Sequence, residues 1–106
     1  MTVTYVIRYD VHPDKVDRFL GLLDTLLDAM RKEETFREAI LHRAPDHGHR
    51  FMLYETWADH QEVRDVQIKR PYRQPWNDAL PDLLAAPRDI SMWTAIRTDR
   101  PGADAG

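Results

Sequence analysis

The sequence predicts an α+β fold in which helices cover one face of a four-stranded antiparallel sheet. Residues 2–11 alternate along the chain with a period of two, which is typical of a strand. Residues 14–34 carry apolar side chains at spacings of three and four, the pattern of an amphipathic helix. Residues 51–62 begin as an apolar, β-favouring run and then turn into a helix. We therefore interpret the chain as two strand–helix passages built around that junction.

In the first passage, a proline and a polar loop mark where the predicted strands end. Residues 2–11 place an apolar and aromatic row on one face of the predicted strand: Val3, Tyr5, Ile7, Tyr9 and Val11. Pro13 ends the strand, because proline has no backbone N–H for a ladder but suits the first turn of a helix. A second strand is predicted over 37–43 and a polar loop over 44–50. The loop leads into a third strand over 51–57, so these two strands should pair antiparallel.

The second passage starts at Asp59. Its side chain can accept a backbone N–H as an N-cap, and Glu62 three residues later can complete a capping box. The predicted helix runs over 59–69 and is broken at Pro71, and Pro75 interrupts the chain again. A third helical piece is predicted over 76–85 and a last strand over 90–98. The tail over 99–106 is rich in Pro, Gly, Ala and Asp, so we expect it to be disordered.

The order β-α-β-β-α-(α)-β is that of the ferredoxin-like split βαβ fold, and residues 1–98 should form one domain. Helices can cover only one face of such a sheet. The predicted strands nevertheless carry apolar residues on both faces, since Val6 alternates with Ile7, and Met52 with Leu53. We therefore expect the second face to be buried in a homodimer that packs sheet against sheet.

Composition excludes several classes of protein. A net charge of −3 argues against a nucleic-acid footprint, which would be basic. No apolar run approaches the roughly 20 residues that span a bilayer, and no signal peptide is visible, so a cytoplasmic protein is expected. The absence of cysteine excludes disulfides and thiolate ligands. No glycine-rich phosphate loop or nucleotide fingerprint is present, so a bound flavin or nicotinamide is not indicated and no cofactor is expected.

Several motifs together resemble the antibiotic biosynthesis monooxygenase (ABM) family. They are the run over 50–57 followed by an acid-capped helix with a proline near its end, Leu-Leu-Ala-Ala-Pro over 83–87, and Arg-Lys-Glu-Glu over 31–34. The resemblance covers roughly residues 3–98. It implies a dimeric α+β barrel. The family includes cofactor-independent monooxygenases that oxidise phenolic, anthrone-like or quinol substrates, haem-degrading enzymes, and proteins without a known activity.

Only some of the functional residues of the family have a counterpart in this sequence. Trp57 matches the tryptophan that lines the active site of polyketide-oxidising members. Gln67 stands where quinol-oxidising members have a histidine. Haem-degrading members use Asn, Trp and His at positions that match Ile7, Gln67 and Trp76, so haem degradation is not expected.

Six residues are candidates for binding a substrate: Trp57, Tyr5, Tyr9, Gln67, Tyr72 and Trp76. Trp57 would stack on a flat ring, and the two strand tyrosines would hydrogen-bond a substrate oxygen. Each also has a plain alternative. The aromatic residues can be core side chains, and Gln67 can be a surface residue. Gln67 could orient a carbonyl or hydroxyl but cannot be a general base, because an amide does not titrate in the working range.

His42 is the candidate catalytic base. If it points inward from its strand, it could deprotonate a phenolic substrate; the alternative is a strand histidine on the wet or dimer face. Arg8 could stabilise a phenolate or form a salt bridge. His47 and His49 form an HxH pair that lacks a third ligand, so we expect a solvated loop and no metal site.

The sequence therefore favours a cofactor-independent monooxygenase that acts on an aromatic, anthrone-like or quinol substrate between sheet and helices. Two alternatives stay open. One is a non-catalytic dimeric barrel that binds a small metabolite. The other is a cyclase or isomerase on the same fold, which would not consume O₂.

Overall fold

The computed structural model describes residues 2–102. The strands and helices are β1 (Val3–Asp10), α1 (Val16–Met30), β2 (Phe36–Ala44), β3 (His47–Trp57), α2 (His60–Asp65), α3 (Gln74–Leu83) and β4 (Asp89–Trp93). Three short 3₁₀ turns join them: η1 (Pro13–Lys15), η2 (Gln67–Lys69) and η3 (Pro71–Arg73). Of the tail predicted to be disordered, residues 103–106 lie outside the described part of the chain.

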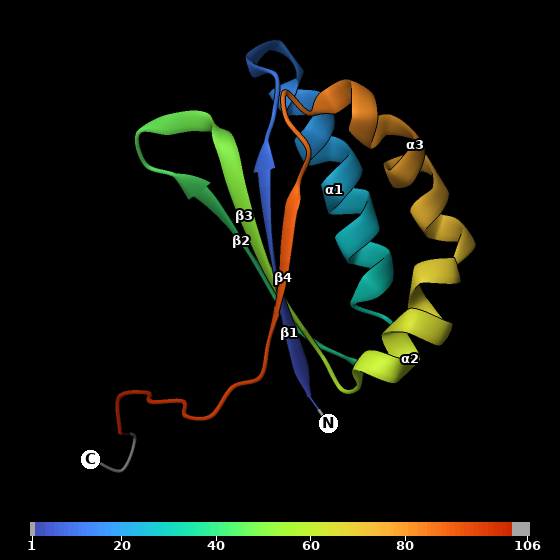
Figure 1. Cartoon of the computed structure of the whole chain (residues 1–106), viewed down its shortest axis with the longest axis vertical. Helices are drawn as coiled ribbons and strands as arrows, with labels where there is room; N and C mark the ends of the chain where they lie inside the picture. Colours follow the sequence, from blue (N-terminus) through green and yellow to red (C-terminus); the bar gives the residue numbers. More distant parts are fainter. Residues whose placement is uncertain (1, 103–106) are drawn as a thin grey trace.

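The four strands form one antiparallel sheet in the order β2-β3-β1-β4, and the helices lie on one side of it (Figure 1). This confirms the predicted ferredoxin-like α+β fold. The register places Tyr5 of β1 opposite Glu55 of β3 and Met92 of β4. Because side chains alternate along strands, these three residues share the helix-facing side. Their neighbours Val6 and Tyr54, which also pair, share the other side, called here the outer face.

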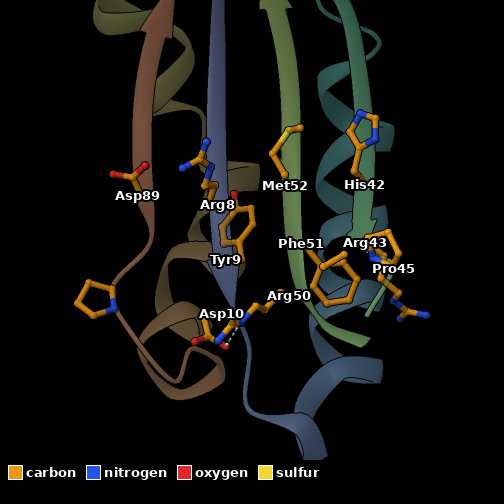
Figure 2. Close-up of a pocket in the computed structure, with 12 residues that line it drawn as sticks. Arg8, Tyr9, Asp10, His42, Arg43, Pro45, Arg50, Phe51, Met52 and Asp89 are labelled. Carbon is orange, nitrogen blue, oxygen red and sulfur yellow. Dashed lines mark ion pairs between the residues drawn. The ribbon is translucent and has the colours of Figure 1, made fainter. Parts of the chain in front are cut away.

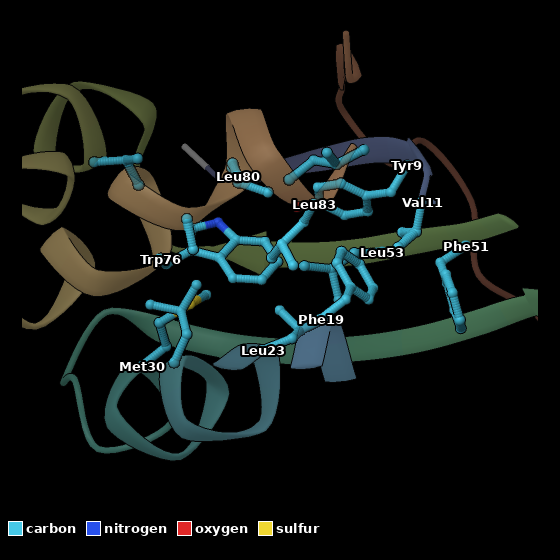
Figure 3. Close-up of a cluster of buried hydrophobic side chains, with 14 of the residues drawn as sticks. Tyr9, Val11, Phe19, Leu23, Met30, Phe51, Leu53, Trp76, Leu80 and Leu83 are labelled. Atoms are coloured by element: carbon cyan, nitrogen blue, oxygen red, sulfur yellow. The ribbon is translucent and has the colours of Figure 1, made fainter. Parts of the chain in front are cut away.

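The core lies between α1, α3 and the helix-facing side of the sheet (Figure 3). Phe19 of α1 is its centre. Its ring centroid is 5.1 Å from that of Tyr9, 5.0 Å from that of Phe51 and 5.4 Å from that of Trp76. Such tilted and edge-on aromatic contacts add roughly 0.5–1.5 kcal/mol each to the burial of the rings. The apolar spacing of the predicted first helix is therefore the face that α1 turns to the sheet.

Several predicted boundaries were wrong. β3 begins at His47 rather than at residue 51, because Ala44 pairs with His47 and shortens the predicted polar loop to Pro45 and Asp46. β4 ends at Trp93 rather than at residue 98. Its partner strand β1 runs out there, since Trp93 already pairs with Thr4.

The predicted helices also differ at their ends. α1 stops at Met30, and residues 31–35 form turns rather than a last helical turn. The helix predicted over 59–69 divides into α2 and η2, because Val66 has a non-helical backbone (φ −121°, ψ −58°). α3 begins two residues earlier than predicted, with Pro75 in its first turn, where a missing N–H costs nothing. The predicted N-cap is confirmed: Asp59 accepts from the backbone N–H of Glu62 at 3.0 Å.

Beyond β4, residues 94–102 form an extended arm without helix or strand structure (Figure 1). Within residues 2–102 no helix has the length and apolar character that crossing a membrane requires.

Candidate active site

Glu55 is a carboxylate inside the protein, on the helix-facing side of β3. Its residue is only 7% exposed. Its Oε1 accepts a hydrogen bond from Trp57 Nε1 at 3.1 Å, and no other hydrogen bond or ion pair to Glu55 is formed within residues 2–102. Burial raises the pKa of Glu55, and the Trp57 hydrogen bond and the charges of Arg73 and Arg88 offset this only in part. Glu55 is therefore a carboxyl group that holds a proton more readily than a solvated one.

Two tyrosines of β1 lie on the same face as Glu55. Tyr5 pairs directly with Glu55 across the strands, and its hydroxyl is 2.7 Å from Nδ1 of His60 at the start of α2. Burial, followed by the negative charges of Glu55 and Asp59, raises the pKa of Tyr5. Tyr9 is buried against the core, and burial and then Glu55 raise its pKa well above the ordinary value. Both phenols are thus uncharged hydrogen-bonding groups beside the carboxylate.

Two arginines complete this site. The guanidinium of Arg73, in η3, lies over the Trp57 ring with its carbon 5.9 Å from the ring centroid. Arg88 precedes β4, and its positive charge acts on both Tyr9 and Glu55. We name the set the Glu55 cluster: Tyr5, Tyr9, Glu55, Trp57, Arg73 and Arg88. Its aromatic walls, carboxyl group and two cations suit proton transfer from a flat ligand that becomes negatively charged.

The β4 edge of the sheet, which Arg88 precedes, is exposed. Ile90 and Met92 lie on the helix-facing side of β4, opposite Ile7 and Tyr5, but are 50% and 55% exposed. The helices therefore leave this edge uncovered. A groove of about 740 Å³ runs between α3 and the segment that enters β4, and Arg88 is part of its lining. Its size lies within the range of small-molecule sites.

Gln67 and Tyr72 belong to a different, neighbouring network. Gln67 is 1% exposed, so it is not the surface residue of the alternative interpretation. Its Nε2 donates to Glu62 at 2.9 Å. The Tyr72 hydroxyl donates to Glu33 Oε2 at 2.7 Å and lies 3.4 Å from Gln67 Oε1. Burial and the Glu33 bond raise the pKa of Tyr72 to about 12. This network fixes the backbone that leads directly into Arg73.

Trp76 and Trp57 have different surroundings. Trp76 packs in the core against Phe19 and Tyr9, in agreement with the alternative interpretation that it is a core side chain. Trp57 is fully buried and packs edge-on against Phe36, with the centroids 5.3 Å apart. Its Nε1, however, is engaged with Glu55. Trp57 is therefore both a core residue and the part of the core that orients the carboxylate.

His42 lies on the outer face, away from the helices. It pairs with Met52, which pairs in turn with Arg8, and the side chains of all three point out of the same side of the sheet (Figure 2). The imidazole is exposed, so the inward orientation that its role as a base requires is not found. A groove of about 590 Å³ on this part of the molecule includes His42, Arg8 and Arg50 in its lining, together with Tyr9.

The remaining histidines do not form a metal centre. His49 Nδ1 lies 3.2 Å from Asp10 Oδ1, and His47 is exposed in the β2–β3 hairpin. Over the described range 2–102, no group of three His, Cys, Asp or Glu residues is arranged to hold a metal ion.

A family model described as antibiotic biosynthesis monooxygenase matches residues 2–74 of the chain. The chain belongs to the ABM family. This confirms the resemblance found in the sequence. Among named relatives of this ABM protein, the Pestalotiopsis microspora protein called "Putative monooxygenase GME11364" is 31% identical over 98 residues, which are 90% of this chain and 80% of the relative. A Synechocystis protein, sll1783, which has no stated function, is 26% identical over 83% of this chain and 59% of its own length.

Solved structures agree with the ABM fold. SnoaB, described as a cofactor-independent oxygenase from Streptomyces nogalater, superposes with a TM-score of 0.80 at 24% identity, over 92% of this chain and 95% of SnoaB. Rv0793 from Mycobacterium tuberculosis superposes with a TM-score of 0.83 at 20% identity, over 94% of this chain and all of Rv0793. At these identities the superpositions establish the fold.

Sequence reasoning overlooked three members of the cluster in this ABM protein, namely Glu55, Arg73 and Arg88. Glu55 had a visible signal, because it alternates with Leu53 and Trp57 on the inward side of an apolar strand. A charged residue at such a position is either paired or functional. Arg73 had no comparable signal, since its approach to Trp57 depends on how η3 folds back over the sheet.

Proposed function

We propose that this chain is a cofactor-independent monooxygenase that oxidises an aromatic, anthrone-like or quinol substrate with O₂ at the Glu55 cluster. Membership of the ABM family and the names of its relatives support an oxygenase. The description of SnoaB supports one that needs no cofactor. The observation that carries the proposal is the buried Glu55, which has a single hydrogen bond and stands beside two phenols and Trp57.

Glu55 takes the role of base that the sequence suggested for His42. For an anthrone-like substrate, Glu55 removes one proton of the reacting CH₂ group, and the carbanion gives one electron to O₂. The radical and superoxide combine, and Glu55 returns the proton to give a hydroperoxide. Loss of the remaining C–H proton then forms a carbonyl group on the substrate and breaks the O–O bond. The hydroxide that leaves takes up this proton and departs as one molecule of water. A carboxyl group whose pKa is raised towards the working pH is suited to both transfers.

The other residues of the cluster bind and orient. Trp57 fixes the Glu55 carboxylate through its Nε1, while Tyr5 and Tyr9 offer hydroxyl groups on the same face. Exclusion of water from this layer would protect the carbanion from simple reprotonation.

Oxygen uptake tests the proposal. The purified chain, treated with a chelator, is given a panel of quinols and anthrones, and O₂ consumption is measured above autoxidation. We expect Glu55→Gln to lower kcat by roughly 100-fold or more, because the base is lost while Trp57 can still bind the amide oxygen. His42→Ala serves as the matched comparison and should retain most of the activity. Activity that survives Glu55→Gln but disappears in His42→Ala would refute the assignment.

We also propose a homodimer in which two outer faces pack together. The centre of this face is apolar, with part-buried Val6, Met52 and Tyr54 beside the exposed Ile40 and Trp93. Such a patch on a small protein is better placed in an interface than in water. This arrangement leaves the Glu55 cluster on the helix side of each protomer.

A further inference from the structure

The buried Nε of Arg73 needs an acceptor that the described chain does not supply. Among residues 2–102 it is the only buried side-chain nitrogen or oxygen atom that lacks a hydrogen-bond partner. Leaving such a donor unpaired costs about 1–3 kcal/mol, so in native proteins an unpaired buried donor calls for a specific explanation. The guanidinium lies over the Trp57 ring. It lies equally close to the Tyr72 ring, with the guanidinium carbon 5.9 Å from each centroid, so the missing acceptor would lie where the Glu55 cluster meets Tyr72.

The charges of the cluster are also unbalanced. Arg73 and Arg88 carry two positive charges, and Glu55 supplies at most one negative charge. Neither arginine has a carboxylate within the 4.0 Å of an ion pair anywhere in the described part of the chain. Arg88 is exposed, so water solvates its charge, whereas Arg73 is partly buried and its Nε is out of contact with water. A charge in a poorly solvated place is costly unless it is matched, so Arg73 is the group for which the chain supplies no counter-charge.

The surroundings of the arginines indicate what the ligand carries besides its charge. Arg88 is part of the lining of the 740 Å³ groove, whose other residues are mainly apolar, including Leu80 and Leu84. The exposed side chains of Ile90 and Met92 continue this apolar surface along β4. A flat hydrocarbon body fits such walls, and a carboxylate is the group that guanidinium binds with two parallel hydrogen bonds.

We propose that the substrate is an aromatic carboxylate, whose anionic group accepts from Arg73 and is drawn in by Arg88, and whose ring lies against the apolar walls of the groove. This proposal rests on the proposed function for the site and its reaction. It adds that the substrate is negatively charged before any proton is removed.

Calorimetric titration without O₂ tests the binding step alone. The ligands are 3-hydroxy-2-naphthoate and its neutral carboxamide, which have the same rings and hydroxyl group. We expect the naphthoate to bind about tenfold or more tightly than the amide, the equivalent of a charge-assisted hydrogen bond. Raising the salt concentration should weaken only the naphthoate.

Variants assign the effect to its residues. Arg73→Met keeps the apolar stem and should weaken naphthoate binding about tenfold while changing amide binding less than twofold. Arg88→Met should act in the same direction and reduce the salt dependence. Arg64→Met, at an exposed position of α2, is the matched control and should change neither ligand. Arg73→Lys, which keeps the charge but not the forked donors, should lie between wild type and Arg73→Met.

The inference is overturned if the two ligands bind equally, if neither binds, or if Arg73→Met weakens both to the same extent. Circular dichroism shows whether each variant is folded, and Arg73→Lys decides the matter if Arg73→Met does not fold. The outcome is separate from that of the oxygenase proposal. Charge-selective binding without O₂ uptake would refute the oxygenase alone, whereas turnover of neutral quinols without charge selectivity would refute the carboxylate alone.

Discussion

At the scale of a single residue, the proposed chemistry depends on Glu55. A strand that alternates Leu53, Glu55 and Trp57 towards a core would ordinarily carry an apolar residue in the middle. The carboxyl group here receives one hydrogen bond and no ion pair within residues 2–102. Such a group costs stability, and a site for proton transfer gives a reason for its presence.

The cost of Glu55 should depend on pH. The unfolded chain loses this proton near the ordinary value of 4.5, whereas the folded protein holds it to higher pH. Above pH 4.5 the folded state therefore binds more protons, and the contribution of Glu55 to the free energy of unfolding falls as pH rises through the folded pKa. We expect the stability of Glu55→Gln relative to wild type to increase over this interval, by at most about 1.4 kcal/mol per pH unit.

Urea unfolding at a series of pH values from 4 to 8 measures this difference. Glu38→Gln, at an exposed position on the outer face, provides the control, and its difference from wild type should stay flat. A difference for Glu55→Gln that also stays flat would show that Glu55 ionises as it does in water.

At the scale of the element, the segment between α2 and α3 depends on Glu33. This residue follows α1 and accepts from Arg70 Nε at 3.0 Å, from Arg70 Nη2 at 3.2 Å and from Tyr72 at 2.7 Å. Burial alone would raise the pKa of Glu33, but the bonds from Tyr72 and Arg70 outweigh it and lower the pKa. One carboxylate thus holds both sides of Pro71, next to Arg73.

Removing this carboxylate should loosen the segment. We expect Glu33→Ala to reduce the free energy of unfolding by about 1–3 kcal/mol, because the part-buried Tyr72 hydroxyl loses its closest partner. Chemical denaturation monitored by circular dichroism gives the value. Glu34→Ala changes the exposed neighbouring residue and should cost less than about 0.5 kcal/mol. Equal effects of the two substitutions would argue against a special role for Glu33.

The limits of an element could be predicted where local sequence signals set them, but not where a partner strand sets them. The periodicity of α1 and the Asp59 cap are local signals, and both were found in the sequence. The ends of β3 and β4 are set by their partner strands, as the pairs Ala44–His47 and Thr4–Trp93 show, so no local pattern contains them. The same reasoning applies to the site. Trp57 and the two β1 tyrosines were found from their strands, whereas Arg73 reaches the cluster only through the turns that precede α3.

At the scale of the whole molecule, the outer face raises the question of assembly. A stable interface buries about 800 Å² on each partner, and this face has an apolar centre that the helices cannot reach. The predicted dimer would cover this centre.

Charge introduced there should separate the protomers. Ile40 is 43% exposed on the outer face, and we expect Ile40→Glu to shift the protein from dimer to monomer, because two carboxylates would be buried near each other. Sedimentation velocity across a range of concentrations measures the shift. Ile68→Glu is a fitting control, since Ile68 is 54% exposed in η2, on the helix side. A wild-type monomer, or a dimer that tolerates Ile40→Glu, would contradict the proposed interface.

The position of β4 has a consequence for the order of folding. The hairpin of β2 and β3 closes around Pro45 and Asp46, so the two strands are adjacent in sequence and little conformational entropy is lost when they pair. Within residues 2–102, β4 pairs only with β1, which lies at the opposite end of the chain. Closing so large a loop is costly in entropy, and contacts that are distant in sequence form late. We therefore expect the β4 side of the Glu55 cluster to assemble last, and local unfolding of this edge strand would admit ligand to a core that is otherwise folded.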